Sequence, residues 1–216
     1  AQGAPAEHYG VDRGAPASML GAILHADPAM CALVARIRTV APTTVSVLVE
    51  GETGTGKELV ARAVHEESVR RDKAFIKVDC GALPRTLLES ILFGHVKGAF
   101  SGALCDRVGL FERANGGTIL FDEVQNLPLD LQSKLLRFTE DGSYERVGES
   151  RTQQSNVRML TATNEDLDRL VRTGAFRRDL YYRLRVVRLR IPPLRERGGD
   201  VPMLAREFCK RYAAQH

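Results

Sequence analysis

The chain has 216 residues, of which 44% are hydrophobic and 27% are charged, and its formal net charge is +4. This composition is typical of a globular protein, and the length suits one domain with a single core, or one domain with part of another. It has no apolar run long enough to cross a bilayer and no signal-peptide pattern, so we expect a cytoplasmic protein without a membrane partner. The mild charge permits an acidic partner without requiring one, and four scattered cysteines predict reduced thiols rather than a metal motif.

Residues 1–17 are rich in Ala, Gly and Pro without periodicity, which predicts a linker or disordered arm. Asp27 and Pro28 then predict the cap and first turn of a helix. Strands and helices alternate beyond it: strand 45–49, helix 57–69, strand 75–79, helix 84–92, strand 118–121, helix 128–140, strand 157–162, helices 165–172 and 176–184, strand 186–190, and a last helix from 201 to about 214. This alternation predicts an α/β fold with helices on both faces of a parallel sheet, and a ligand crevice at the carboxyl ends of its strands.

A glycine-rich turn lies between the first strand and the following helix: Gly51-Glu52-Thr53-Gly54-Thr55-Gly56-Lys57-Glu58. Glycines allow a tight bend that points several N–H groups at one anion, and the helix start adds its positive dipole end. We expect Lys57 to reach the β- and γ-phosphates of a nucleotide. Glu58 stands where the general pattern has a Ser or Thr hydroxyl for magnesium. The alternative is an ordinary glycine-rich turn before a helix.

The apolar strand at 118–121 delivers two acids, Asp122 and Glu123, to the same edge of the sheet. Asp122 is placed to hold Mg²⁺, directly or through water, and Glu123 to orient and deprotonate an attacking water. A solvated strand end is the alternative. Together with the glycine-rich turn, the two acids indicate a nucleoside triphosphatase. Asn164, after the strand at 157–162, could contact the γ-phosphate or the water, or could cap the next helix.

Two segments break the alternation of strands and helices. Residues 93–105 are glycine-rich and contain Phe100, an aromatic side chain with no evident core to enter, which makes it a candidate contact for a partner. In the alternative, Phe100 packs into its own domain. We expect residues 141–156 to form a long polar loop, and loops of this size are usually functional or disordered. The basic segment 176–184 could supply an arginine to a neighbouring subunit's phosphates, or could be a solvated helix face.

The chain resembles the ATPase domain of bacterial enhancer-binding proteins, the sigma-54-dependent transcription activators of the AAA+ class, from about Met19 to Met203. The most specific match is Gly98-Ala99-Phe100-Ser101-Gly102-Ala103, where the family has threonine at position 101. The Gly-Lys-Glu ending of the phosphate loop is also typical of the family. So are Tyr181-Tyr182-Arg183-Leu184 and the Pro192–Arg197 segment.

The resemblance implies a P-loop AAA+ core over residues 18–199 that uses ATP and Mg²⁺ and couples hydrolysis to remodelling of sigma-54 RNA polymerase closed promoter complexes. Residues 51–58 then match the nucleotide loop. Asp122 and Glu123 match the magnesium and catalytic acids, and Asn164 lies in the first sensor strand. Arg177 and Arg183 match arginines used in trans within a ring, most often a hexamer.

The resemblance also implies that residues 98–103 contact sigma-54, with Phe100 and Ser101 at the loop tip, and that residues 145–148 form a second loop that moves with the first. The family continues into a helical lid, of which we expect only the first helix within residues 200–216. DNA would be contacted only through a domain absent from this chain.

Two residues depart from the family pattern. Ser101 lacks the methyl group of threonine, which predicts sigma-54 contact weakened by up to about tenfold rather than abolished. Asp79 replaces an asparagine that hydrogen-bonds the catalytic glutamate in the family. We expect either that this carboxylate or that of Glu123 takes a proton, or that the two move apart, which would alter this switch between nucleotide and loops while retaining hydrolysis.

Other classes of P-loop protein remain as alternatives at this stage. A small-molecule kinase needs an acceptor pocket and a helicase needs a basic DNA-tracking loop; the segment 98–103 is neither. A nucleotide-binding module without hydrolysis is a further alternative, and the presence of Lys57, Asp122 and Glu123 argues against it.

Overall fold

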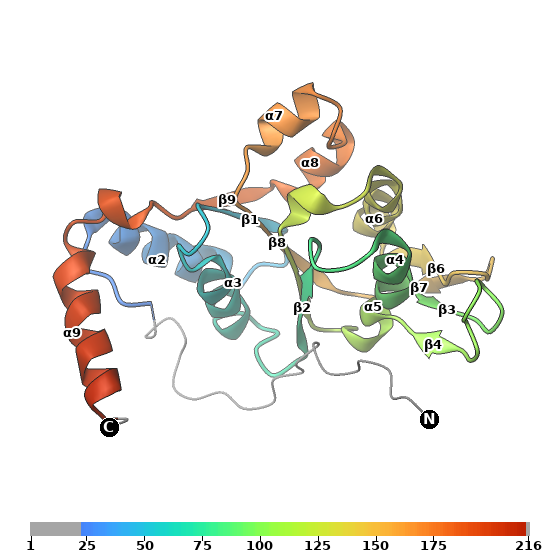
Figure 1. Cartoon of the computed structure of the whole chain (residues 1–216), viewed down its shortest axis with the longest axis horizontal. Helices are drawn as coiled ribbons and strands as arrows, with labels where there is room; N and C mark the ends of the chain where they lie inside the picture. The colour runs from blue at the N-terminus through green and yellow to red at the C-terminus, as the bar shows by residue number, and fades with distance from the viewer. Residues whose placement is uncertain (1–22, 215–216) are drawn as a thin grey trace.

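A five-stranded parallel sheet in the order β2-β5-β8-β1-β9 forms the centre of the molecule (Figure 1). The computed structural model describes residues 23–214, so the predicted arm at 1–17 lies outside the described residues. The strands are β1 (Val47–Glu50), β2 (Phe75–Asp79), β5 (Thr118–Asp122), β8 (Arg158–Thr163) and β9 (Val187–Arg190). This order confirms the predicted parallel sheet and brings the carboxyl ends of β5, β8 and β1 next to one another.

Helices cover both faces of the sheet, as predicted. The main ones are α2 (Pro28–Val40), α3 (Lys57–Glu66), α4 (Arg85–Phe93), α5 (Leu110–Arg113), α6 (Leu129–Asp141), α7 (Leu167–Arg172), α8 (Arg178–Leu184) and α9 (Asp200–Ala213). In Figure 1, α2 and α3 lie to the left of the sheet and α4, α5 and α6 to its right. None of the helices within residues 23–214 is long and apolar enough to cross a membrane.

The alternation of side chains along each strand produces two separate cores. Val47 and Val49 of β1 pack with α2 and α3, whereas Leu48 between them belongs to the cluster with α4, α5, α6 and α8. Successive strand residues point to opposite faces of a sheet, so apolar residues at consecutive positions need cover on both sides. The continuous apolar run of β1 therefore requires the three-layer arrangement.

Polar side chains secure both ends of α2. The Asp27 carboxylate accepts a hydrogen bond from the Ala29 N–H at 2.9 Å, and Pro28 occupies the first turn, which confirms the predicted cap. At the other end, the buried Arg158 guanidinium donates to the carbonyls of Ala41 at 2.6 Å and Val40 at 3.1 Å. A cation at a helix C-terminus satisfies the last carbonyl groups and opposes the helix dipole.

The prediction of a structureless polar loop at 141–156 is wrong. This segment contains an antiparallel hairpin of β6 (Ser143–Glu145) and β7 (Thr152–Gln154). Tyr144 is its buried anchor and packs beside Phe93, Phe111 and Phe138. The other side chains of these short strands are polar or face solvent, so the apolar pattern did not indicate strands.

A second two-stranded stem, β3 (Gly94–His95) and β4 (Arg107–Val108), brackets the glycine-rich segment. Neither this stem nor the single-turn helix α5 was predicted, because two to four residues are too few to show periodicity. The longer predicted elements are present, with ends displaced by up to three residues.

Candidate functional site

The glycine-rich turn connects the end of β1 to the first residue of α3. Gly54 and Gly56 have φ values of +82° and +94°, in the left-handed region where a side chain is strained. The Thr55 hydroxyl donates to the Glu52 carbonyl at 2.7 Å and closes the turn. The result is the predicted strand–turn–helix arrangement, in which the turn leads directly into the N-terminus of α3, and such a helix start suits an anion.

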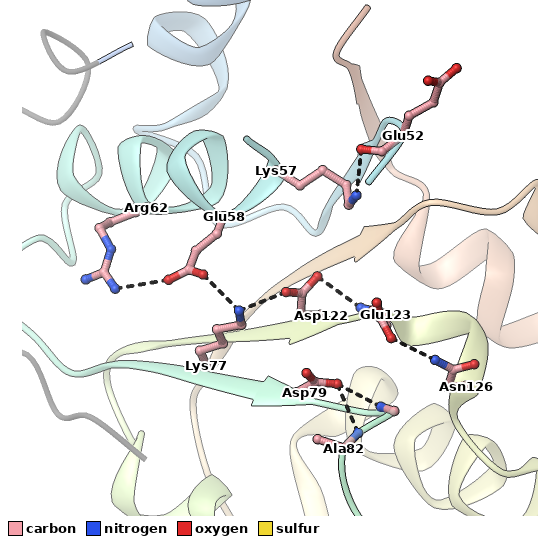
Figure 2. Close-up of polar contacts among 11 residues, drawn as sticks. Glu52, Lys57, Glu58, Arg62, Lys77, Asp79, Ala82, Asp122, Glu123 and Asn126 are labelled. Carbon is pink, nitrogen blue, oxygen red and sulfur yellow. Dashed lines mark hydrogen bonds and ion pairs between the residues drawn. The ribbon is translucent and has the colours of Figure 1, made fainter. Parts of the chain in front are cut away.

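Lys57 begins α3 and folds back over the turn. Its ammonium donates to the Gly51 carbonyl at 3.0 Å and to the Glu52 carbonyl at 3.1 Å (Figure 2). Burial lowers the pKa of Lys57, and the nearby charges of Asp122 and Glu123 oppose that shift. The cation therefore stands within the electrostatic reach of both predicted acids, as a phosphate-binding lysine requires.

Asp122 and Glu123 occupy the carboxyl end of β5, and the backbone of Glu123 is unusual. With φ of +52°, Glu123 is the one non-glycine residue of the described chain with positive φ. Its N–H donates to the Asp122 carboxylate at 3.1 Å, and its own carboxylate accepts from the Asn126 amide at 3.0 Å (Figure 2). Strained backbone at a strand end is common at functional sites, because surrounding contacts must hold it.

Lys77 is a charged residue of this site that the sequence interpretation missed. Its ammonium lies 2.8 Å from a Glu58 oxygen and 2.9 Å from an Asp122 oxygen (Figure 2). Burial lowers the pKa of Lys77, but hydrogen bonds to the two carboxylates outweigh it and raise the value to about 12. The available signal was a lysine within an otherwise apolar strand, two residues before Asp79.

Asn164 connects the end of β8 to the phosphate loop. Its amide donates to the Thr53 hydroxyl at 3.0 Å, and its oxygen accepts from Gln125 at 2.6 Å. Gln125 in turn accepts from the Thr163 hydroxyl at 2.8 Å. The alternative role as a helix cap is wrong, because Asp166 caps α7. Gln125 was not predicted, since it follows Glu123 in a short turn without a recognisable pattern.

Asp79 lies directly opposite Asp122 in the register of β2 and β5, rather than opposite Glu123. Its carboxylate accepts from the N–H groups of Gly81 at 2.9 Å and Ala82 at 3.1 Å. A Cβ atom built on Gly81 would lie 2.7 Å from the Glu123 carboxylate, so this backbone passes close to Glu123. Within the described chain, no hydrogen bond joins Asp79 to Glu123, and the switch role of Asp79 remains a prediction.

Arg177 and Arg183 lie exposed at the start and end of α8. The Arg177 guanidinium forms a two-point ion pair with Asp179, at 3.0 and 2.6 Å, and donates to the Ser133 hydroxyl at 3.1 Å. Neither arginine forms an ion pair or hydrogen bond with the phosphate loop of its own chain in the described region. Their use in trans therefore stays a prediction.

The segment 98–103 forms a compact turn on the stem of β3 and β4. The Gly98 N–H donates to the Ala103 carbonyl at 2.9 Å, and Gly102 has a φ value of +104°. Phe100 is 43% exposed and forms a T-shaped ring contact with His95, with ring centroids 5.0 Å apart. Phe100 is thus supported on one side and open on the other, and it does not enter either core.

The hairpin of β6 and β7 touches this segment through its backbone. The Val96 N–H donates to the Val147 carbonyl at 3.1 Å, and the Val147 N–H donates to the Gly94 carbonyl at 2.9 Å. A Cβ atom on Gly148 would lie 2.6 Å from that of Ala99. The two loops therefore cannot move independently without breaking these contacts.

Comparisons with known proteins agree with this geometry. The family model described as the Sigma-54 interaction domain matches residues 23–190. The regulatory protein AtoC of Escherichia coli is 50% identical over 196 residues, which are 91% of this chain and 42% of AtoC. The Nif-specific regulatory protein of Bradyrhizobium diazoefficiens is 47% identical over 215 residues, which are 97% of this chain and 37% of that protein. The chain thus spans less than half the length of these relatives.

A solved structure with the same fold is that of NtrX from Brucella abortus in complex with ATP. It matches with a TM-score of 0.82 and 36% identity, over 89% of this chain and 44% of NtrX. The parallel sheet with helices on both faces and this likeness confirm the predicted P-loop AAA+ fold.

Proposed function

This chain belongs to the family of sigma-54 interaction domains, and from that premise we propose that it hydrolyses ATP to ADP and phosphate and uses the turnover to act on sigma-54. The observation that carries the proposal is the shared position of two elements at the carboxyl edge of the parallel sheet: the phosphate loop with Lys57 after β1, and Asp122 and Glu123 at the end of β5. Helix α4, which follows β2 of the same sheet, leads into the stem of the loop at 98–103.

The residues present fit a nucleotide with its metal. The glycine-rich turn at residues 51–56, the N-terminus of α3 and the Lys57 ammonium suit the phosphates, and Asp122 offers the carboxylate oxygen that Mg²⁺ prefers. When bound, ATP supplies the bond to be broken and Mg²⁺ neutralises its charge. Glu123 orients and deprotonates the attacking water, and Asn164 aligns the phosphate loop through Thr53.

Transmission to the loop follows the chain itself. The Asp79 carboxylate holds the N–H groups that begin the segment leading into α4. That helix ends at Phe93, and the next residue, Gly94, starts the stem of the 98–103 loop. A shift of the Glu123 side chain against Gly81 would therefore be carried along a rigid helix to Phe100. Two states with different contacts are needed for such coupling.

The partners follow from the exposed elements. Phe100 and Ser101 present the loop tip to the sigma-54 factor of RNA polymerase, and the outward placement of Arg177 and Arg183 suits a homo-oligomeric ring in which each subunit completes its neighbour's site. We propose no direct DNA contact for this chain.

The test has two parts, made on a longer form of the protein that can assemble. ATP turnover is measured in the wild type and in Glu123→Gln; we expect a loss of about 10²–10⁴-fold in the variant, because the general base is removed, with nucleotide binding retained. Capture of sigma-54 is then measured with an ADP–metal fluoride mimic, with ADP, and without nucleotide. Capture with the mimic alone supports the proposal; capture under none of these conditions contradicts it.

A further inference from the structure

Lys77 forms contacts that none of the roles described above requires. It projects from β2 between α3 and β5, and its ammonium touches one carboxylate on each (Figure 2). The phosphate loop already has its cation in Lys57, whose contacts are the carbonyl groups of Gly51 and Glu52. Lys77 is therefore a second cation, bound to acids rather than to the anion cradle.

Lys77 forms an ion pair with Asp122, the carboxylate proposed to hold the metal. One oxygen of Asp122 accepts from Lys77 at 2.9 Å, and the other accepts from the Glu123 N–H at 3.1 Å. The Asp122 side chain is 18% exposed and that of Lys77 is 35% exposed, so water screens the pair only in part. A divalent cation that coordinates Asp122 must displace one of these donors or accept a fixed positive charge beside it.

Glu58 is held in the same way. One of its oxygens accepts from Lys77 at 2.8 Å, and the other lies 3.5 Å from the Arg62 guanidinium. Glu58 stands at the position where the general phosphate-loop pattern has a magnesium-binding hydroxyl. Both acids on the metal side of the turn thus have an ammonium between them.

We propose that Lys77 is a positioning residue that keeps Asp122 and Glu58 closed to a divalent cation alone, so that the metal enters only together with a polyphosphate. This inference rests on the proposed function, because it concerns the same nucleotide site. The negative charge of a triphosphate offsets the repulsion between the metal and Lys77, whereas a bare metal ion meets that repulsion in full. Metal affinity then depends on the nucleotide.

The test measures binding of Mn²⁺ alone to the nucleotide-free protein, by the electron paramagnetic resonance signal of free Mn²⁺. We expect Lys77→Met to bind Mn²⁺ at least about tenfold more tightly than the wild type, since a nearby positive charge is removed. Lys73→Met is the matched control, because it removes an exposed lysine from the turn before β2, and it should bind as the wild type does. Lys77→Gln gives the same comparison if Lys77→Met does not fold.

Unchanged or weaker Mn²⁺ binding in both neutral variants would overturn the inference, because Lys77 would then only shape Asp122. Lys77→Arg keeps the charge and should bind Mn²⁺ as weakly as the wild type; binding as tight as in Lys77→Met would also overturn it. Binding of ATP with excess Mg²⁺ to the wild type is measured separately. Its absence would contradict the proposed function, whereas its presence with unaltered Mn²⁺ affinity in the variants would contradict this inference alone.

Discussion

The phosphate edge of the sheet and the 98–103 loop are built in opposite ways. The first lies at the ends of buried five- and six-residue strands, β5 and β8, and its side chains are held by hydrogen bonds, such as those of Lys57 to the turn carbonyls and of Asn164 to Thr53. The second stands on strands of two residues each and leaves Phe100 43% exposed. This difference suits the roles proposed for the two regions, because catalytic groups need fixed geometry and a loop that acts on a partner needs room to move.

The connection between the two regions is as informative as their difference. The loop touches the core through α4 and through the backbone pairing of Val96 with Val147. Small shifts at a rigid site are amplified when the element that receives them is held by few contacts. The comparison therefore predicts that changes in the loop alter partner binding but not turnover.

Of these variants, Phe100→Ala should show the largest difference between its effect on sigma-54 capture and its effect on ATP turnover. Truncating an exposed aromatic anchor removes its contact area from the partner, and we expect sigma-54 capture to fall by about 30-fold or more, the usual loss at a binding hot spot. ATP turnover should stay within about twofold of the wild type. Val69→Ala, which truncates a 75% exposed residue after α3, should alter neither. Equal losses of capture and turnover in Phe100→Ala would show that the loop belongs to the catalytic unit.

Acid should loosen the rigid region through His65. Burial, followed by the charge of Arg62, lowers the pKa of this imidazole to about 4, and its ring bonds the Thr118 hydroxyl at 2.9 Å. The neutral form is stabilised in the folded state. The stabilisation that neutral His65 gives the fold is therefore complete above its pKa in the unfolded chain, which is near 6.5. It is lost as the pH falls toward 4, and the free energy of unfolding then decreases by about 2 kcal/mol after allowance for solvent screening.

Urea titrations between pH 7 and pH 4 test how steeply the free energy of unfolding decreases as the pH falls. His65→Gln should flatten this dependence, because the side chain that takes up a proton on unfolding is then absent. An unaltered slope in His65→Gln would mean that another group controls the acid response.

The structure separates what residue patterns can predict from what they cannot. The strand–turn–helix at 51–57 was predictable because glycines, an apolar run and a helical pattern occur in sequence, and Asp122 was predictable as the end of a buried strand. The Lys77 bridge was not, because it depends on β2 lying beside β5, and an alternating pattern carries no strand order. The contact of Asn164 with Thr53 was not predictable for the same reason, because it connects the ends of two neighbouring strands. The hairpin at 143–154 was missed because Tyr144 is its one buried aromatic side chain.

Gly148→Ala should test the contact between the two loops. Gly148 has a φ value of +82°, and an added Cβ would lie 2.6 Å from that of Ala99. Gly174, with a φ value of +75° and no atom within 4 Å of an added Cβ, is the matched control for backbone strain. Both alanine variants should lose about 1 kcal/mol, or about 2–4 °C in Tm, from the backbone alone.

Gly148→Ala should in addition reduce sigma-54 capture several-fold, because the methyl group separates the loops, while Gly174→Ala should capture normally. Differential scanning calorimetry and the capture assay distinguish the two effects. Equal capture by both variants would show that the 98–103 loop acts without support from the hairpin.

Ser101→Thr should have the smallest effect and acts on the loop tip alone. Ser101 is exposed beside Phe100, so an added methyl group can gain area only against a partner. We expect sigma-54 capture to tighten by up to about tenfold, since one buried methyl group contributes roughly 1 kcal/mol, and ATP turnover to stay unchanged. Ser101→Ala, which removes the hydroxyl without adding the methyl group, separates the two contributions. If the wild type captured no sigma-54 and Ser101→Thr did, the methyl group would be needed to order the whole loop tip. The loop would then depend on its exact side chains more than the contrast with the phosphate edge implies.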